Sequence, residues 1–283
     1  MIILIADSGS TKTDWLLLDT AVGPLKPFIT SGLNPCLMTD EDITRRLTTE
    51  VRPKLAEHLC GHSLDCIRFY GAGCRPDQIS RMAGHLSSAF STNDVEVASD
   101  LLGAARALCG RRPGIVGILG TGSGSALYDG RKFQQQTPSL GYILGDEGSG
   151  AVLGRRLLGD IFKRQLPETI VRAFEEETYC TIDDAICNVY REPAPNRYLA
   201  QFTHFLADHR EDENVHALLV NEFRLFFSRN VAAYCRPNLP VHLVGSIAHV
   251  FVEELLEAAE KEGCKIGKVL RSPIDGLGDY YVN

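Results

Sequence analysis

The sequence lacks several features that would assign it to a membrane or to a nucleic acid. It contains no apolar run near the ~20 residues that a membrane span requires. The apolar residues 2–6 are too few for a signal peptide and have no basic flank. Dense blocks of Lys and Arg are absent and the formal net charge is -7, whereas phosphate backbones are bound by clustered cations. We therefore expect a cytoplasmic protein without a membrane or nucleic-acid partner.

The sequence also lacks any pair of cysteines with the C-x-x-C spacing, although it contains nine cysteines. An odd number of widely spread cysteines is typical of reduced thiols in a cytosolic enzyme rather than of disulfides or zinc. His58 and His62 stand four residues apart with Cys60 between them, and Cys66 follows, a spacing that could hold zinc. We favour a structural interpretation, because Gly61 and the histidines are typical of a helix end.

What the chain does contain is an alternation of strand-like and helix-like segments. The first part predicts strands at 2–6, 16–18, 67–70 and 95–98, and helices after Thr39 and at 76–90 and 99–109. The later part predicts strands at 241–244 and 266–269, and helices at 148–165, 167–179, 195–209, 212–235 and 246–262. Such alternation indicates an α/β architecture, and 283 residues suffice for about two domains of ~150 residues.

One pattern occurs twice. Residues 3–19 (ILIADSGSTKTDWLLLD) form an apolar strand, a loop of small polar residues and a second apolar strand, and residues 114–130 (GIVGILGTGSGSALYDG) repeat this order. The segment 109–114 (CGRRPG) between them is the best candidate for a domain boundary. Two copies of one unit predict a duplicated fold with a cleft between the halves.

The first loop has the composition of a phosphate-binding loop. Residues 9–13 (GSTKT) offer backbone N–H groups, hydroxyl donors and one cation. Asp7 would repel a phosphate unless a cation such as Mg²⁺ lay between them. A Walker A loop would lead into a helix, whereas a strand follows here, and the segment after Gly120-x-Gly122 predicts a hairpin rather than a dinucleotide-binding helix. Each loop alone could be a simple turn, but two equivalent loops favour phosphate binding.

The two loops resemble the phosphate motifs of the sugar kinase, heat-shock protein and actin ATPase superfamily. Residues 142–150 (YILGDEGSG) are similar to the signature of N-acetylglucosamine kinases and of the related benzoyl-CoA reductase activase ATPases. Residues 241–251 (VHLVGSIAHVF) resemble the adenosine motif. The motifs occur in family order and span residues 1 to about 251, so that the resemblance covers nearly the whole chain.

This resemblance implies two RNase H-like domains of the actin-like ATPase type with ATP in the cleft. The first domain would comprise residues 1–112 with 270–283, and the second residues 113–269. The likeness gives Asp7 the role of organising Mg²⁺. It places the phosphates against Gly9, Ser10, Thr11, Lys12, Gly120, Thr121, Gly122 and Ser123, and the adenosine against Gly245 and Ser246.

Three further residues are candidates for the sugar. Asp100 follows a predicted strand at the start of a helix, and in the sugar kinases an Asp before an Ala-rich helix is the catalytic base; a helix cap is the alternative. Asp146 would bind sugar hydroxyls by resemblance, or else cap the next helix together with Glu147. Asn34 resembles a sugar-contacting Asn, or is a turn residue before Pro35.

The expected activity is ATP-dependent phosphorylation of the 6-hydroxyl of an amino sugar, with N-acetylglucosamine as the first choice and glucosamine or another hexose next. The animal N-acetylglucosamine kinases carry Asn where this chain has Gly124, and Trp and His where it has Leu140 and Tyr142. Because those positions help to recognise the sugar, Tyr142 is a candidate sugar contact.

Two other functions stay open. An activase-like ATPase would need cysteines for an iron-sulfur cluster between two subunits; Cys74 follows a glycine-containing turn, but no second cysteine stands beside it in the sequence. An ATP-dependent sugar sensor would bind without turnover. A homodimer is also left open.

Overall fold

The chain divides into two compact units. The computed structural model describes residues 1–9, 11–25, 27–59 and 63–282. Unit 1 comprises residues 1–112, 130–132 and 272–283, and unit 2 comprises residues 113–129 and 133–271. Ser10, expected at the nucleotide, and Cys60, Gly61 and His62 of the histidine segment lie outside the described residues.

Unit 1 is built on a mixed sheet with the strand order β3-β2-β1-β5-β6, and β4 also pairs with β2. Its strands are β1 Ile2–Ser8, β2 Lys12–Asp19, β3 Gly23–Pro24, β4 Phe28–Ser31, β5 Cys66–Gly71 and β6 Val95–Ser99. Strands β1 and β2 form an antiparallel hairpin, whereas β1, β5 and β6 run parallel. The carboxyl ends of these three parallel strands therefore meet at one edge of the sheet.

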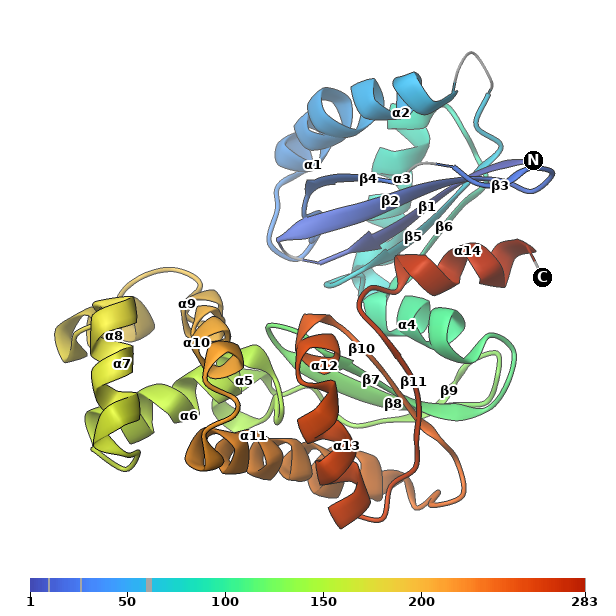
Figure 1. The fold of residues 1–283 in the computed structure, drawn as a ribbon. Coiled ribbons are helices and arrows are strands. Elements are labelled where there is room, and N and C mark those ends of the chain that lie inside the picture. The colour runs from blue at the N-terminus through green and yellow to red at the C-terminus, as the bar shows by residue number, and fades with distance from the viewer. Residues whose placement is uncertain (10, 26, 60–62, 283) are drawn as a thin grey trace. The chain divides into compact units, whose positions relative to one another are not determined.

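Helices cover both faces of this sheet (Figure 1). They are α1 Asp40–Arg46, a π-helical stretch Leu47–Val51, α2 Arg52–Leu59, α3 Pro76–Phe90, α4 Asp100–Cys109 and α14 Ile274–Val282. One core joins α1, α2 and α3 to the sheet through apolar residues such as Leu47, Met82 and Trp15. On the opposite face α14 packs against α4, and Leu16 of β2 reaches Gly278 of α14.

Unit 2 repeats the sheet topology. Its strands are β7 Gly114–Leu119, β8 Ser123–Tyr128, β9 Phe133–Gln136, β10 Val241–Val244 and β11 Ile266–Leu270. Their order is β11-β10-β7-β8-β9, with an antiparallel β7–β8 hairpin and parallel β7, β10 and β11. The duplication that the sequence predicts from residues 3–19 and 114–130 is confirmed.

Unit 2 has a larger set of helices, which share one apolar core with its sheet. They are α5 Gly141–Leu144, α6 Gly150–Phe162, α7 Glu168–Thr178, α8 Ile182–Tyr190, α9 Pro195–Gln201, α10 Thr203–Asp208, α11 Glu213–Phe226, a π-helical stretch Phe227–Val231, a 3₁₀ turn Ala232–Tyr234, α12 Ser246–Val250 and α13 Val252–Lys261. Figure 1 shows α7 and α8 at the end of this unit that lies away from its sheet. Within the described residues, none of the helices has the length and apolar character needed to cross a membrane.

The predicted α/β architecture is confirmed, with differences at element ends. The expected helices 195–209 and 246–262 are each two helices, and the second is interrupted at Phe251, whose φ of -104° and ψ of 37° are not helical. Helix α6 begins at Gly150 rather than at 148, because the Ser149 side chain caps it. The eight cysteines that the structure describes have free thiols, as expected for a reduced protein.

Candidate active site

The first group of predicted site residues lies at the carboxyl edge of the unit 1 sheet. Ser8, Gly71 and Ser99 are in register across the parallel strands β1, β5 and β6. Asp7 is therefore the next-to-last residue of β1, and Asp100 directly follows β6. Ligand sites in α/β sheets are found at this edge, so the fold places both carboxylates where a ligand would bind.

Asp7 lies in a strongly negative environment. Its pKa is raised from 3.8 to about 8, mainly by burial and then by the carboxylates of Asp100 and Asp14, while the Lys12 ammonium lowers it by less. The Lys12 ammonium lies 2.8 Å from the Asp14 carboxylate, with which it forms an ion pair. A cation beside Asp7 would relieve this repulsion.

These residues fit a magnesium ion. Mg²⁺ is usually held by one or two carboxylates together with substrate phosphates and water. Asp7 supplies one desolvated carboxylate that forms no ion pair with a cationic side chain among the described residues. Within the part of the chain that the structure describes, no group of three or more His, Cys, Asp or Glu side chains could hold a metal by itself. A metal at Asp7 would thus depend on the nucleotide for its other ligands.

Asp100 is the first residue of α4, but it is not the cap of that helix. The cap is Ser99, whose hydroxyl accepts the Leu102 N–H at 3.3 Å. Asp100 Oδ1 accepts the N–H of Leu101 at 2.8 Å, and burial raises the pKa of this carboxyl. The capping role that the sequence left open for Asp100 therefore belongs to its neighbour.

The first phosphate loop forms the tight end of the β1–β2 hairpin. The Gly9 N–H donates to the Lys12 carbonyl at 2.9 Å, and the hydroxyls of Ser8 and Thr13 form a hydrogen bond of 2.7 Å below the turn. Thr11 and Lys12 are exposed. Because strand β2 follows the loop directly, the exclusion of a Walker A loop is confirmed.

Asn34 is buried against the turn that follows β5. Its Oδ1 accepts the Cys36 N–H at 3.0 Å, which is the local bond of an Asx turn around Pro35. A β-carbon on Gly73, whose φ is +78°, would stand 2.0 Å from Asn34 Oδ1. Asn34 therefore makes the hydrogen bond of the turn around Pro35, and its side-chain amide lies beside the turn at the carboxyl end of β5.

The second phosphate loop, in unit 2, is bound to the start of α6. The Gly120 carbonyl accepts the Gly150 N–H at 2.8 Å, and the Thr121 carbonyl accepts the Ala151 N–H at 3.1 Å. Gly120 also donates to the Gly122 carbonyl at 3.0 Å, which closes the turn. The loop that resembles a phosphate motif is therefore held in one conformation by the protein itself.

Asp146 lies directly beside this loop. Its carboxylate accepts the backbone N–H of Ser123, and burial is the main cause of its raised pKa. Its φ of +56° is uncommon for a residue other than glycine. Since Ser149 caps α6, the capping function that the sequence left open for Asp146 and Glu147 is not their role here.

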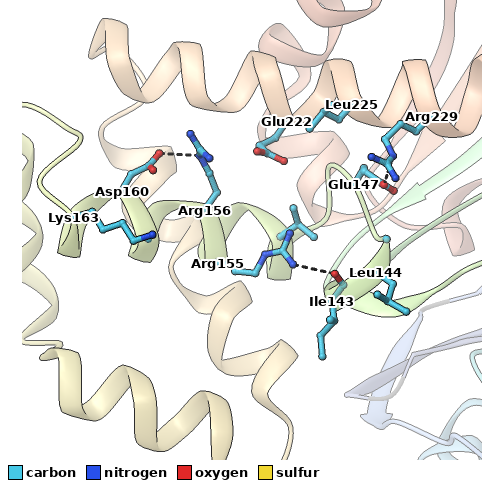
Figure 2. A pocket seen from close by; sticks show the side chains of 13 residues that line it. Ile143, Leu144, Glu147, Arg155, Arg156, Asp160, Lys163, Glu222, Leu225 and Arg229 are labelled. Atoms are coloured by element: carbon cyan, nitrogen blue, oxygen red, sulfur yellow. Dashed lines mark hydrogen bonds and ion pairs between the residues drawn. The ribbon is translucent and has the colours of Figure 1, made fainter.

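Glu147 connects this segment to the π-helical stretch Phe227–Val231 that follows α11. Its carboxylate forms an ion pair with Arg229 at 2.7 Å and accepts a hydrogen bond from the Asn230 amide at 3.2 Å. Figure 2 shows Arg229 and Glu147 at one side of a cavity of about 460 Å³. Sequence reasoning missed Arg229 and Asn230, because no motif surrounds them.

Tyr142 is anchored through its main chain. Arg155 of α6 donates to the Tyr142 carbonyl at 2.6 Å, and the Tyr142 side chain packs partly buried against the unit 2 core. The Arg155 side chain extends from α6 toward α5 in Figure 2. Helix α6 therefore contacts both the second phosphate loop and the segment that carries Tyr142.

The adenosine motif lies next to the second phosphate loop within unit 2. Gly245 follows β10 with a φ of +124°, and a β-carbon there would stand 2.2 Å from the Leu119 carbonyl oxygen. Only glycine fits this close approach. Ser246 is exposed at the first position of α12, so Gly245 and Ser246 lie beside Gly120 at the carboxyl edge of the unit 2 sheet.

Comparisons with known proteins agree with this arrangement. Protein-family models and curated proteins give no match. The chain is similar to a crystal structure of a proposed N-acetylglucosamine kinase from Porphyromonas gingivalis, with 46% identity, 99% of both chains covered and a TM-score of 0.95. A second proposed N-acetylglucosamine kinase, from Chromobacterium violaceum, is 19% identical over 99% of this chain and 98% of that chain, with a TM-score of 0.75.

A third similar structure is a ROK family glucokinase from Streptomyces griseus in complex with glucose and AMPPNP. It is 14% identical over 99% of this chain and 98% of that chain, with a TM-score of 0.61, and shows the fold alone. The duplicated sheets and this likeness show the actin-like ATPase fold. The chain belongs to the family of N-acetylglucosamine kinase-like sugar kinases.

Proposed function

We propose that this protein is an ATP-dependent kinase that phosphorylates the 6-hydroxyl of an amino sugar, with N-acetylglucosamine as its first substrate. The observation that carries the proposal is the pair of carboxylates, Asp7 and Asp100, at the carboxyl edge of the unit 1 sheet. The family relationship to the Porphyromonas gingivalis protein supports the class of acceptor.

The nucleotide would be bound by main-chain groups more than by side chains. In this proposal the loop at Gly9–Lys12, with Ser10 assigned by resemblance, and the loop at Gly120–Ser123 contact the phosphates through backbone N–H groups. Gly245 and Ser246 contact the adenosine. The close approach of Gly245 to Leu119 supports this assignment, because it brings the two motifs of unit 2 to one place.

Asp100 would act as the base in the transfer. The sugar O6 forms a bond to the γ-phosphorus while the bond from that phosphorus to the β,γ-bridging oxygen breaks, and ADP leaves. Asp100 accepts the O6 proton late, because the transition state of phosphoryl transfer is loose and depends mostly on positioning and charge. When Mg²⁺ is bound at Asp7, it would neutralise part of the phosphate charge.

Three residues besides Asp100 would contact the sugar. We assign Asp146 to a pair of sugar hydroxyls and Asn34 to a further sugar hydroxyl. Tyr142 would contact the substituent by which one sugar differs from another. The Ser123 N–H and the Asx turn hold the first two side chains in place, which limits the entropy that sugar binding costs. Gly124, Leu140 and Tyr142 differ from the residues of the animal N-acetylglucosamine kinases at these positions. Glucosamine or another hexose is therefore the second choice of substrate.

The test is ATP turnover with purified protein, Mg²⁺ and a panel of N-acetylglucosamine, glucosamine and glucose, with the product identified by NMR. We expect turnover that depends on the sugar and a product phosphorylated at the 6-hydroxyl. Turnover at one rate with and without every sugar would contradict the proposal and favour an activase-like ATPase. Binding of ATP and sugar without turnover would favour a sensor.

A further inference from the structure

A cavity of about 460 Å³ in unit 2 is lined by charged side chains, most of which the proposed transfer does not use. It lies between α6, α11 and the segment 143–147 (Figure 2). Arg156 and Gly159 of α6 and Lys163 directly after it stand three and four residues apart, so that they share one face of the helix. Glu222 points from α11 toward α6 in Figure 2. Cavities of ~300 to 1,000 Å³ are typical of small-molecule sites.

Two cations of this cavity have no carboxylate partner among the described residues. Arg155 donates to the Tyr142 carbonyl at 2.6 Å but forms no ion pair, and the Lys163 ammonium forms neither a hydrogen bond nor an ion pair. Arg156 forms an ion pair with Asp160 at 2.9 Å. A guanidinium group carries five N–H donors, so both arginines have donors left for an anion. The wall that α6 forms is therefore suited to a phosphate group.

Gly159 keeps this wall open. It lies inside α6, where glycine costs ~1 kcal/mol of stability relative to alanine, and a β-carbon there would meet no atom within 4 Å. At Gly154 of the same helix, by contrast, a β-carbon would stand 1.8 Å from the Leu199 carbonyl oxygen. Packing within the protein therefore requires glycine at position 154 but not at position 159. The missing side chain leaves room for a ligand between Arg156 and Lys163.

Glu222 supplies a group of the opposite sign. Its partly buried carboxyl forms no hydrogen bond or ion pair with another described residue, and burial raises the pKa of this group. A carboxylate accepts hydrogen bonds from hydroxyl and amino groups. Ile143 and Leu225 add apolar surface to the lining. Cations for a phosphate, an acceptor for hydroxyl and amino groups and apolar surface for a ring together match a phosphorylated amino sugar.

We propose that this cavity is a regulatory site for a phosphorylated amino sugar. The phosphate binds to Arg155, Arg156 and Lys163, and the hydroxyl and amino groups of the sugar donate to Glu222. This assignment rests on the proposed function, because such a compound is the product of the proposed reaction. The site is distinct from the proposed acceptor site, since Asp146 does not line the cavity.

The cavity shares two side chains with the segment 142–147, which carries proposed sugar contacts. Arg155 holds the Tyr142 carbonyl, and Arg229 pairs with Glu147 at 2.7 Å. A phosphate in the cavity competes for both guanidinium groups and repels the Glu147 carboxylate. Occupation of the cavity therefore loosens this segment and raises the KM for the sugar, by ~5-fold or more for a coupling of ordinary size. The product would thus inhibit its own formation.

The first test is isothermal titration calorimetry with N-acetylglucosamine 6-phosphate, in the presence of saturating N-acetylglucosamine to block the acceptor site. We expect binding to the natural chain, weakened ~10-fold or more by Lys163→Glu and by Gly159→Leu. Gly159→Leu should not lower the melting temperature, because leucine is a better helix former than glycine. Arg172→Glu, an equal charge reversal at an exposed position of α7, is the control and should bind as the natural chain does.

No binding to the natural chain, or equal binding to the natural chain and to both cavity variants, would overturn the site. Inorganic phosphate is the second probe, and binding as tight as that of the sugar phosphate would overturn the recognition of the sugar. These measurements involve no turnover, so their outcome is separate from that of the kinase assay.

The second test is the initial rate of sugar phosphorylation with added N-acetylglucosamine 6-phosphate. Lys163→Glu and Gly159→Leu should keep the natural kcat and sugar KM without the product, and the product should inhibit them less than it inhibits the natural chain. Equal inhibition of all three proteins would show that the product acts at the acceptor site alone, and would overturn the regulatory role.

Discussion

The Asn34 side chain lies so close to Gly73 that no residue with a β-carbon would fit at position 73. A β-carbon at Gly73 would stand 2.0 Å from Asn34 Oδ1, and the φ of Gly73 is +78°. The side chain proposed to contact the sugar is thus packed directly against the turn after β5. The position of the Asn34 side chain therefore depends on the absence of a side chain at position 73.

We therefore expect Gly73→Ala to displace Asn34 and to raise the KM for the sugar by ~10-fold or more, since misplaced contacts weaken binding. The KM for ATP should change little. The backbone strain at positive φ should also cost ~1 kcal/mol of stability or more. Steady-state kinetics well below the melting temperature measure both constants.

Gly84→Ala is the matched control, because Gly84 lies inside α3 and a β-carbon there meets open space. It should leave the sugar KM unchanged and stabilise the helix by up to ~1 kcal/mol. An unchanged sugar KM in Gly73→Ala would remove Asn34 from the proposed sugar site.

Mg-ATP should raise the melting temperature of the protein. A ligand that binds only the folded state stabilises it by ~2.7 kcal/mol at one hundred times its dissociation constant, which corresponds to a shift of several degrees. Differential scanning fluorimetry with ATP alone, with Mg²⁺ alone and with both measures the effect. If millimolar Mg-ATP produces no shift, the assignment of the two loops to phosphate is wrong.

The stability of the ligand-free protein should fall as the pH rises from 5 to 8. The Asp7 carboxyl keeps its proton in the folded protein up to about pH 8. In the unfolded chain the same carboxyl loses its proton near pH 3.8. Between these values the folded state holds one more proton, so the free energy of unfolding decreases with pH, by at most ~1.4 kcal/mol per unit. Asp100, Asp14 and Lys12 face this group.

Asp7→Asn should flatten that decline, because the variant carries no proton to lose. Melting temperatures across the pH range compare the two proteins. A decline of the same slope in Asp7→Asn would show that another group causes it.

Arg229 should act on sugar binding from outside the site. Its ion pair with Glu147 holds the residue after Asp146. Arg229→Ala should raise the sugar KM up to ~10-fold, which equals ~1.4 kcal/mol, with a smaller change in kcat. Arg224→Ala, which removes an ion pair to Glu262 from the preceding helix α11, is the control and should leave both constants unaltered. Equal effects of the two variants would contradict the role of Arg229.

Much of the fold follows from local patterns in the sequence. The continuous apolar runs that become β1 and β7, and the period of Ile43, Leu47, Val51 and Leu55, indicate buried strands and an amphipathic helix before any contact is known. The short strands β3 and β4 carry no such pattern, because they lie at the edge of the sheet and are stabilised by pairing with β2.

The site was less predictable than the fold. The loops at Gly9 and Gly120 could be found because their composition is local. The pairing of Glu147 with Arg229 joins positions far apart in the sequence, and only the packing of α11 and the π-helical stretch after it brings them together. Likewise, the sequence allowed Asp100 to be a cap, since Ser99 and Asp100 are both good capping residues; the backbone geometry at Ser99 decides between them.

The proposed phosphoryl transfer depends on Asp100 as the base, and Asp100→Asn tests this role. Asn keeps the size of the side chain and much of its hydrogen bonding but cannot accept the proton from the sugar. Positioned bases contribute ~10² to 10⁴-fold, so kcat should fall by that amount. Nucleotide affinity should change little, because other residues are proposed to hold ATP.

The most direct measurement compares kcat and melting temperature in Asp100→Asn and Ser99→Ala. We expect Asp100→Asn to lose ~10²- to 10⁴-fold in kcat and to melt near the natural protein. Ser99→Ala, which removes the cap of α4, should lose ~1 kcal/mol of stability and retain most of its kcat. A nearly natural kcat in Asp100→Asn would show that Asp100 is not the base.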